Sequence, residues 1–182
     1  PEAIRFLESK FKTEERISIH QARFSELHKL FSANDFDGIL ADIGVSSYQL
    51  DTAERGFSFM KDGPLDMRMN QNIGEDASSW LNNAPEQEIS NIIWKYGEEK
   101  KAKRIAKAIV EARKSYKIRT TKELAEIILE ETPRRFNDKK HPATKTFQAI
   151  RIFINNELEE LDLLLDFTSK HLKIGGRTCI IS

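Results

Sequence analysis

One long stretch of the chain mixes ionic and apolar side chains in a way that could hold a small ligand. It starts at Asp42, directly after the apolar segment Phe36–Ala41, and runs without a regular period to Asn70. Connections between elements usually span about 2–6 residues, and longer ones are often functional. The side chains available to a ligand are Asp42, Gln49, Arg55, Phe57, Phe59, Met60, Asp66, Met67, Arg68 and Met69.

Asp42 is the residue of this stretch that is best placed for chemistry. Ligands of open α/β sheets bind outside the carboxyl ends of the strands, and a carboxylate there accepts hydrogen bonds from amino or hydroxyl groups. The alternative is that Asp42 only caps the next turn. Ser46 and Ser47 lack the G-x-S-x-G pattern of a hydrolase nucleophile, so we expect them to fix the loop backbone.

The other loop residues allow two interpretations each. Arg55, Asp66 and Arg68 could contact phosphate, but we favour ion pairs that order the loop. Phe57 and Phe59 could stack on a base that has left its duplex, or they could anchor the loop in the core.

The elements that must position these residues predict an α/β fold. Helical periodicity covers Pro1–Phe11 and Arg23–Ala33, and the short apolar runs Arg16–Gln21 and Phe36–Ala41 indicate strands. A strand, a helix and a strand in this order predict a parallel βαβ unit with a right-handed crossover.

The middle of the chain is predicted to be helical. Apolar residues at helical spacing predict helices from Pro85 to Gly97, over Glu98–Ser115, and from Thr120 to Pro133, the last with a capping box. One further helix is predicted from Thr144 to about Leu172. It should end at Gly175 and Gly176 and lead into a strand over Arg177–Ser182. A helical segment therefore interrupts a doubly wound sheet.

The composition excludes several classes of protein. Of the 182 residues, 39% are hydrophobic and 32% charged, and no apolar run nears the roughly 20 residues that span a bilayer. There is no signal-peptide pattern, and the single Cys179 cannot form an internal disulfide, so we expect a reducing, cytoplasmic setting. No Cys/His spacing suggests a metal site, and no Walker-type loop suggests a nucleotide triphosphate.

Charge is distributed unevenly along this neutral chain. Glu98–Arg119 holds nine Lys/Arg against three Glu, and Arg134–Lys145 holds five against one Asp. Such basic segments suggest a polyanion partner, although a charged run is often only a solvated helix face. The candidate contacts for an RNA backbone in the first segment are Lys100, Lys101, Lys103, Arg104, Lys107, Arg113, Lys114, Lys117 and Arg119.

Three blocks of the sequence carry a resemblance to a known family. They are DIGVSSYQLDTAERGFSFMKDGPLDMRMN at 42–70, YGEEKKAKRIAKAIV at 96–110 and HPATKTFQAIRIFINNELEEL at 141–161. In this order they closely resemble the bacterial ribosomal RNA small subunit methyltransferase H family, also called MraW. The resemblance covers essentially the whole chain.

The resemblance implies a Rossmann-like methyltransferase fold with an inserted all-helical domain. Residues 1–72 and 143–182 would form the core, and residues 73–142 would recognise the substrate. It also implies S-adenosylmethionine-dependent methylation of a cytosine N4 in the decoding centre of 16S ribosomal RNA, within the small ribosomal subunit. Self-association as a homodimer stays open.

Several residues receive roles through the resemblance. Asp42 corresponds to a carboxylate that contacts the cofactor and meets the target amine, while Phe24 and Gln49 correspond to further cofactor contacts. The alternatives are core packing for Phe24 and a solvated loop residue for Gln49. Among the basic residues, the preferred RNA contacts are Lys100, Arg104, Lys107, Arg113 and Lys114. In the last block, Arg151 and Asn155 look like supports beneath the loop.

The resemblance places a glycine-rich cofactor loop before Pro1 and a further extension after Ser182. We therefore expect the sequence to be part of a longer chain, to bind S-adenosylmethionine weakly, and to leave residues 43–75 disordered without cofactor. Two other functions stay open: a non-catalytic RNA-binding module that uses the basic helices, and a nucleotide-binding enzyme of different chemistry.

Overall fold

The computed structural model describes residues 2–32, 36–133 and 140–181. They form two compact units. The sheet unit comprises Pro1–Ile43 and Leu158–Ser182, and the helical unit comprises Gly44–Glu157. Among the described residues, none of the helices combines the length and apolarity that a membrane span requires.

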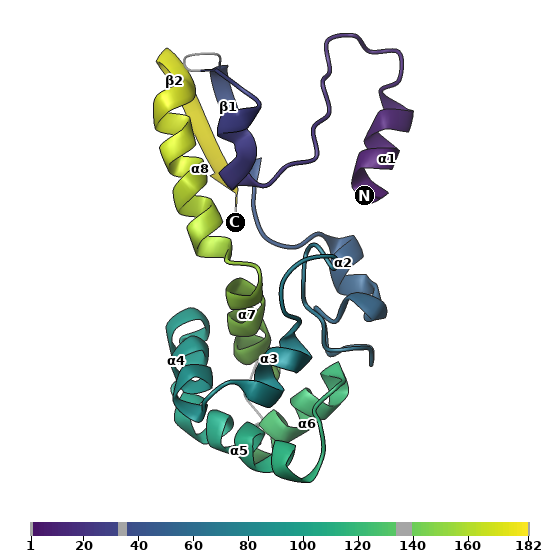
Figure 1. The fold of residues 1–182 in the computed structure, drawn as a ribbon, viewed down its shortest axis with the longest axis vertical. Coiled ribbons are helices and arrows are strands. Elements are labelled where there is room, and N and C mark those ends of the chain that lie inside the picture. Colours follow the sequence, from purple (N-terminus) through teal and green to yellow (C-terminus); the bar gives the residue numbers. More distant parts are fainter. Residues whose placement is uncertain (1, 33–35, 134–139, 182) are drawn as a thin grey trace. The chain divides into compact units, whose positions relative to one another are not determined.

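The sheet unit is built on two parallel strands, β1 (Phe36–Asp42) and β2 (Leu172–Ile181), which lie side by side in Figure 1. Its helices are α1 (Glu2–Lys10), the 3-10 helix η1 (Phe24–Lys29) and most of α8 (Glu157–His171). The expected helix near the start and the expected strand before Asp42 are thus confirmed.

Aromatic contacts join α8 to β1. The ring of Phe167 lies 5.9 Å from that of Phe36 and 6.4 Å from that of Phe31, between ring centroids. A second link comes from Glu160, whose carboxylate accepts hydrogen bonds from the Ser25 backbone N–H (3.0 Å) and hydroxyl (2.9 Å). Helix α8 therefore fixes both η1 and the strand that ends at the candidate carboxylate.

The predicted βαβ unit in the first part of the chain is wrong. Residues Arg16–Gln21 form no strand, and helical structure within Arg23–Ala33 is limited to η1, with Ala33 itself outside the described residues. Strand backbone must pair its N–H and C=O groups, and the partner of β1 is β2, from the other end of the chain.

The single long helix predicted from Thr144 to Leu172 is also wrong. Helix α7 (Ala143–Ile154) is capped by Asn155, and α8 starts at Glu157. Asn156 has φ 51°, a left-handed conformation that asparagine tolerates better than most residues. The apolar spacing continues through this break, so periodicity alone could not reveal it.

The pair Gly175-Gly176 does not end the helix, because β2 begins immediately after His171 and includes both glycines. Phe36 pairs with Leu172 but Gly38 pairs with Arg177, so β2 carries extra residues at this point. Gly175, with φ 86°, accommodates the irregularity.

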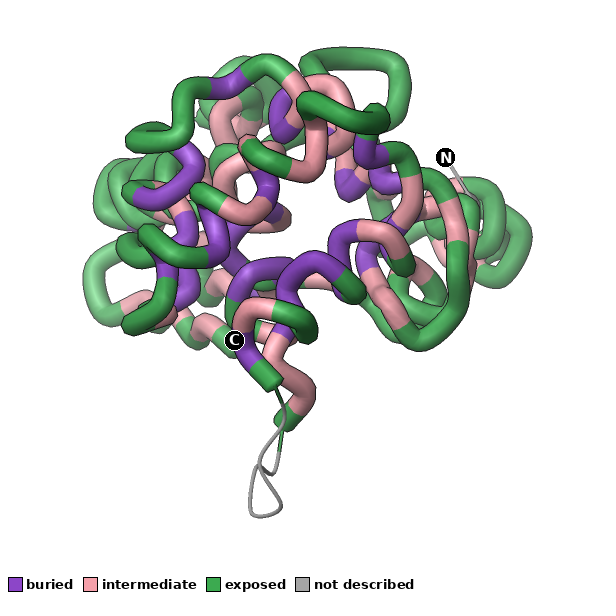
Figure 2. The backbone as a smooth tube through the Cα atoms, turned by 90° about the horizontal axis from the view of Figure 1, so that it is seen from below, coloured by how far each residue is buried: buried purple, intermediate pink, exposed green. Residues whose placement is uncertain are grey.

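The helical unit contains the predicted helices of the middle region. Each is amphipathic, and in Figure 2 buried and exposed stretches alternate along the tube as such helices require. The capping box of Thr120 and Glu123 is present. The elements are α2 (Ser47–Asp51), the 3-10 helix η2 (Ala53–Arg55), α3 (Ala77–Asn83), α4 (Glu86–Gly97), α5 (Ala102–Ser115), α6 (Thr121–Glu131) and α7.

Helix α5 is shorter than predicted because Glu98, with φ 50°, turns the chain out of α4 before α5 starts at Ala102. A close approach of α4 and α7 makes Gly97 necessary. A Cβ atom at Gly97 would lie 2.5 Å from the Lys145 carbonyl oxygen. The core around these helices includes the fully buried Ile93, Ile105 and Ile150.

The compact units divide the chain at other places than the boundaries 72/73 and 142/143 taken from the resemblance. The loop before residue 73 packs with the helices, because Phe57, Leu65 and Met67 are buried in the helical core. Helix α7 packs against α4 and belongs to the same unit.

Candidate functional site

Asp42 is the last residue of β1 and is exposed. Because β1 and β2 are parallel, Asp42 and its register partner Ile181 lie at the carboxyl edge of the sheet, and the next residue is tied there by the Ile43 N–H to Ile181 carbonyl hydrogen bond (2.9 Å). Within the described residues, the Asp42 carboxylate makes no hydrogen bond or ion pair. It is therefore an available acceptor at the sheet edge where ligands bind.

The two other expected cofactor contacts differ in their surroundings. Phe24 opens η1 in the sheet unit and is half-buried. Gln49 lies in α2 of the helical unit, where its Oε1 accepts hydrogen bonds from the Ser46 N–H (2.9 Å) and hydroxyl (3.2 Å). Ser46 in turn caps α2 by accepting from the Gln49 N–H, so Ser46 fixes the loop backbone as expected.

The loop after Asp42 is held by contacts within the helical unit. Near its middle it is joined to the start of α6: the Leu65 N–H donates to the Arg119 carbonyl (2.8 Å), and the Thr121 N–H donates to the Gly63 carbonyl (2.9 Å). The Gly63 N–H returns a bond to the Thr121 hydroxyl (3.2 Å). These partners belong to the chain itself, so the loop is attached to the helical unit at its middle.

A second attachment involves Asn155 at the end of α7. Its Nδ2 donates to the Met67 carbonyl (2.7 Å), and its Oδ1 accepts from the Met69 N–H (2.6 Å). Met67 is fully buried and has φ 61°, a strained conformation for a residue with a side chain. Asn155 thus supports the loop as predicted, whereas Arg151 instead pairs with Glu157 (2.8 Å).

Ionic side chains complete the loop, in agreement with the favoured interpretation. Arg68 pairs with Asp66 (2.8 Å), and Arg55 donates to the Arg68 and Met69 carbonyls. Burial, the largest influence on Asp66, raises its pKa, but hydrogen bonds from Arg68 and Gln71 together lower the pKa below its ordinary value of 3.8. The carboxylate is therefore ionised at neutral pH.

Phe57 and Phe59 anchor the loop in the core. Phe57 is 6% exposed, and the half-buried Phe59 ring packs edge-on against that of Phe147 at 4.9 Å between centroids. In this structure neither ring is presented to solvent as a platform for a base.

The predicted RNA contacts on or next to α5 divide into two groups. Lys100, Arg104, Lys107 and Lys114 are exposed. Arg113 instead reaches inward, where its guanidinium donates to the carbonyls of Leu81 (2.6 Å) and Ala84 (2.8 Å) at the end of α3. We therefore assign Arg113 to the packing of α3 against α5. Arg134, Arg135 and Lys139 of the second basic segment lie outside the described residues.

The exposed cations are paired to different degrees. Arg104 contacts Glu131 (2.5 Å) and Lys114 contacts Glu111 (2.6 Å). Among the described residues, Lys100 and Lys107 form no ion pair. Surface pairs of this kind contribute little to stability, so they leave the cations available to a polyanion.

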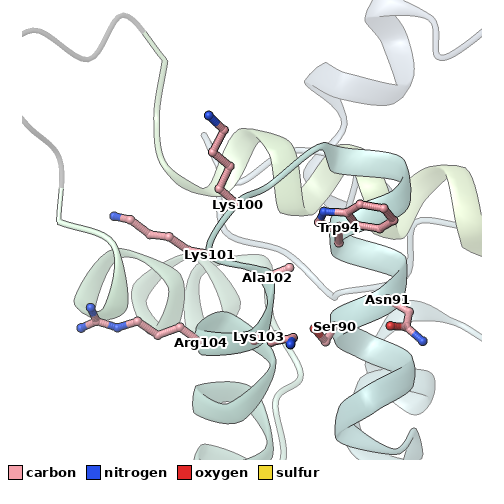
Figure 3. Close-up of a pocket in the computed structure, with 8 residues that line it drawn as sticks. All are labelled: Ser90, Asn91, Trp94, Lys100, Lys101, Ala102, Lys103 and Arg104. Atoms are coloured by element: carbon pink, nitrogen blue, oxygen red, sulfur yellow. The ribbon is translucent and has the colours of Figure 1, made fainter.

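Sequence reasoning missed Trp94, which is 66% exposed on α4. It lines a hollow with the start of α5, drawn in Figure 3. The sequence does place Trp94 next to Ile93 but outside the apolar face of its helix, a few residues before the basic segment that starts at Lys100.

Comparison with known proteins supplies the family. The model of the MraW methylase family matches residues 1–182. The chain belongs to the MraW methylase family. Its small parallel sheet and many helices are consistent with an α/β fold, as expected.

Two curated relatives carry the name ribosomal RNA small subunit methyltransferase H. The chain is 51% identical to the one from Stenotrophomonas maltophilia (strain K279a) over 183 residues, which cover 100% of the chain and 56% of the relative. It is 49% identical to the one from Xanthomonas oryzae pv. oryzae (strain PXO99A), covering 100% of the chain and 54% of that relative. The chain thus spans about half the length of these relatives.

Proposed function

We propose that this chain is part of an S-adenosylmethionine-dependent methyltransferase that methylates the N4 amino group of a cytosine in the decoding centre of 16S ribosomal RNA. The observation that supports this most is the exposed carboxylate of Asp42, which pairs with none of the described residues, at the carboxyl edge of a parallel sheet in an MraW family member. The names of the relatives support a ribosomal RNA substrate, and such a substrate fits a cytoplasmic protein.

Asp42 has the role of an acceptor for the target amine. The lone pair of a cytosine N4 is delocalised into the ring, so the amine is a weak nucleophile. A carboxylate that accepts one of its N–H hydrogens draws the nitrogen towards tetrahedral geometry and fixes its orientation. Asp42 makes no bond within the described chain that would compete with this role.

S-adenosylmethionine, when bound, supplies a methyl group on a sulfonium that is already reactive. The residues present suit parts of this cofactor: Phe24 offers a half-buried ring as a wall for an adenine, and Asp42 offers an acceptor. Gln49 offers an amide that can donate through Nε2 while its Oε1 stays in the cap of α2. Within the helical unit, Gln49 lies in the short helix α2 of the loop that Asn155 and Thr121 attach.

The basic surface of the helical unit has the role of contacting the RNA backbone. Lys100, Arg104, Lys107 and Lys114 are exposed on or next to α5. Lysine and arginine contacts to phosphate release counterions, so binding should weaken steeply with salt.

The test is methyl transfer by the full-length protein from labelled S-adenosylmethionine to small ribosomal subunits that lack the modification, followed by nucleoside analysis. We expect the label in N4-methylcytidine of the 16S RNA. Label in another nucleoside would refute the position of methylation. RNA binding without any transfer would support the alternative of a non-catalytic RNA-binding module.

A further inference from the structure

A hollow between α4 and α5 combines an exposed aromatic ring with a group of cations. Its lining residues are Ser90, Asn91, Trp94, Lys100, Lys101, Ala102, Lys103 and Arg104, and its cavity volume is about 600 Å³. In Figure 3 Trp94 and Asn91 extend from α4, while Lys100, Lys101 and Arg104 extend from the turn and the start of α5. All of these residues belong to the helical unit.

Trp94 is an unusual residue to find at the surface. With 66% of its surface exposed it adds little to the core, which its neighbour Ile93 enters fully. The other tryptophan in the sequence, Trp80, is 5% exposed and donates its indole N–H to Glu88 (2.8 Å). A large ring left open to solvent beside a hollow is available for a flat partner.

The charges around the hollow favour an anionic partner. Four of its lining residues are cations, and no lining residue is acidic. The nearest acidic side chain in the sequence, Glu99, is engaged, since its carboxylate accepts from the Lys101 N–H (2.9 Å). Arg104 pairs with Glu131 but stays 63% exposed. Two of the lining residues, Ser90 and Ala102, are buried.

From this combination we infer that the hollow binds an unpaired nucleotide of the RNA substrate, with its base stacked on Trp94 and its phosphates near Lys100, Lys101 and Lys103. Aromatic stacking with cations along the backbone is how single-stranded nucleic acids are bound without strict sequence preference. This inference rests on the proposed function, since it takes RNA as the substrate. It assigns to α4 a contact with the RNA at a nucleotide other than the one that is methylated.

The experiment measures binding of a short single-stranded RNA to the full-length protein, together with a series in which each nucleotide in turn lacks its base. Trp94→Ala should weaken binding of the intact RNA by about 5- to 160-fold, the range for one stacked base. At the one nucleotide whose base stacks on Trp94, removal of the base should weaken binding to the wild type by the same factor. The same removal should not weaken binding to Trp94→Ala any further. Trp94→Phe should restore most of the affinity.

Tyr116→Ala is the matched control. Tyr116 is an exposed aromatic residue of the same unit, 47% accessible, and it does not line the hollow. The Tyr116→Ala variant should bind RNA with the same affinity as the wild type. Both rings are largely exposed, so neither truncation should lower the melting temperature noticeably.

Two results would overturn the inference: affinity of Trp94→Ala within twofold of the wild type, or an equal loss for intact and abasic RNA at all positions. The second would indicate that Trp94 contributes to RNA binding without stacking on a base. Methyl transfer is measured in parallel. If the wild type transfers methyl groups and Trp94→Ala binds RNA as tightly as the wild type, only the stacking site is refuted. If the wild type binds RNA through Trp94 but transfers no methyl group, only the proposed reaction is refuted.

Discussion

Replacing Asn155 by Ala tests how the loop after Asp42 is held. The side chain is half-buried and satisfies two loop groups, the Met67 carbonyl and the Met69 N–H. Its third bond, to the Arg151 carbonyl, is not essential, because that carbonyl also accepts from the Asn155 backbone N–H. Leaving a buried polar group unsatisfied costs about 1–3 kcal/mol.

Because water can reach a half-buried site, each of the two groups should cost near the lower end of that range. We therefore expect Asn155→Ala to reduce the free energy of unfolding of the helical unit by about 2–3 kcal/mol. Asn155→Asp keeps the acceptor for Met69 but places a carboxylate oxygen against the Met67 carbonyl, so it should be at least as destabilising at neutral pH.

The assay is urea denaturation followed by circular dichroism, combined with hydrogen exchange at the Met69 amide. Asn83→Ala is the matched control, because Asn83 is exposed and its Nδ2 bonds only to the Ser79 carbonyl of its own helix. It should cost about 0.5 kcal/mol or less. Equal stability of the two alanine variants, with unchanged protection of Met69, would refute the support by Asn155.

Three other predictions follow from the described contacts. The pKa of Asp66 is lowered in the folded chain, so the ionised carboxylate stabilises the fold above pH 3.8, and this stabilisation is lost as the pH falls through the folded pKa. In acid titrations, the difference in unfolding free energy between the wild type and Asp66→Asn should therefore shrink only below about pH 3.8. Gly97→Ala places a Cβ against the Lys145 carbonyl and should lower the unfolding free energy by about 1–3 kcal/mol, and an unchanged value would contradict the close contact of α4 and α7. Lys107→Gln should weaken ribosomal RNA binding and lower the slope of log affinity against log salt by about 1, while Arg113→Lys should lower the melting temperature and leave that slope unchanged.

Elements whose local signals agree with their packing were predictable from the sequence. Helix α6 has a capping box followed by an apolar stripe, and β1 is an apolar run that ends in a carboxylate. The same holds for part of the site, since the position of Asp42 and the support by Asn155 were both predicted and are found.

The remaining features depend on distant parts of the chain. Residues Arg16–Gln21 have strand-like composition but pair with no strand among the described residues. The break at Asn155 and Asn156 occurs within continuous apolar spacing, at the residue that bonds to the distant Met67. The inward direction of Arg113 depends on the carbonyls at the end of α3, which no local pattern reveals.

The central claim, that the carboxylate of Asp42 acts on the target amine, is tested most directly by single-turnover methyl transfer with cofactor and small subunits at saturation. Asp37, an exposed aspartate at the other end of β1 that pairs with Lys173, provides the control variant Asp37→Ala. We predict that Asp42→Ala slows the transfer step by about 100-fold or more, while Asp37→Ala transfers at the wild-type rate. Transfer by Asp42→Ala at a rate close to that of the wild type would contradict the account.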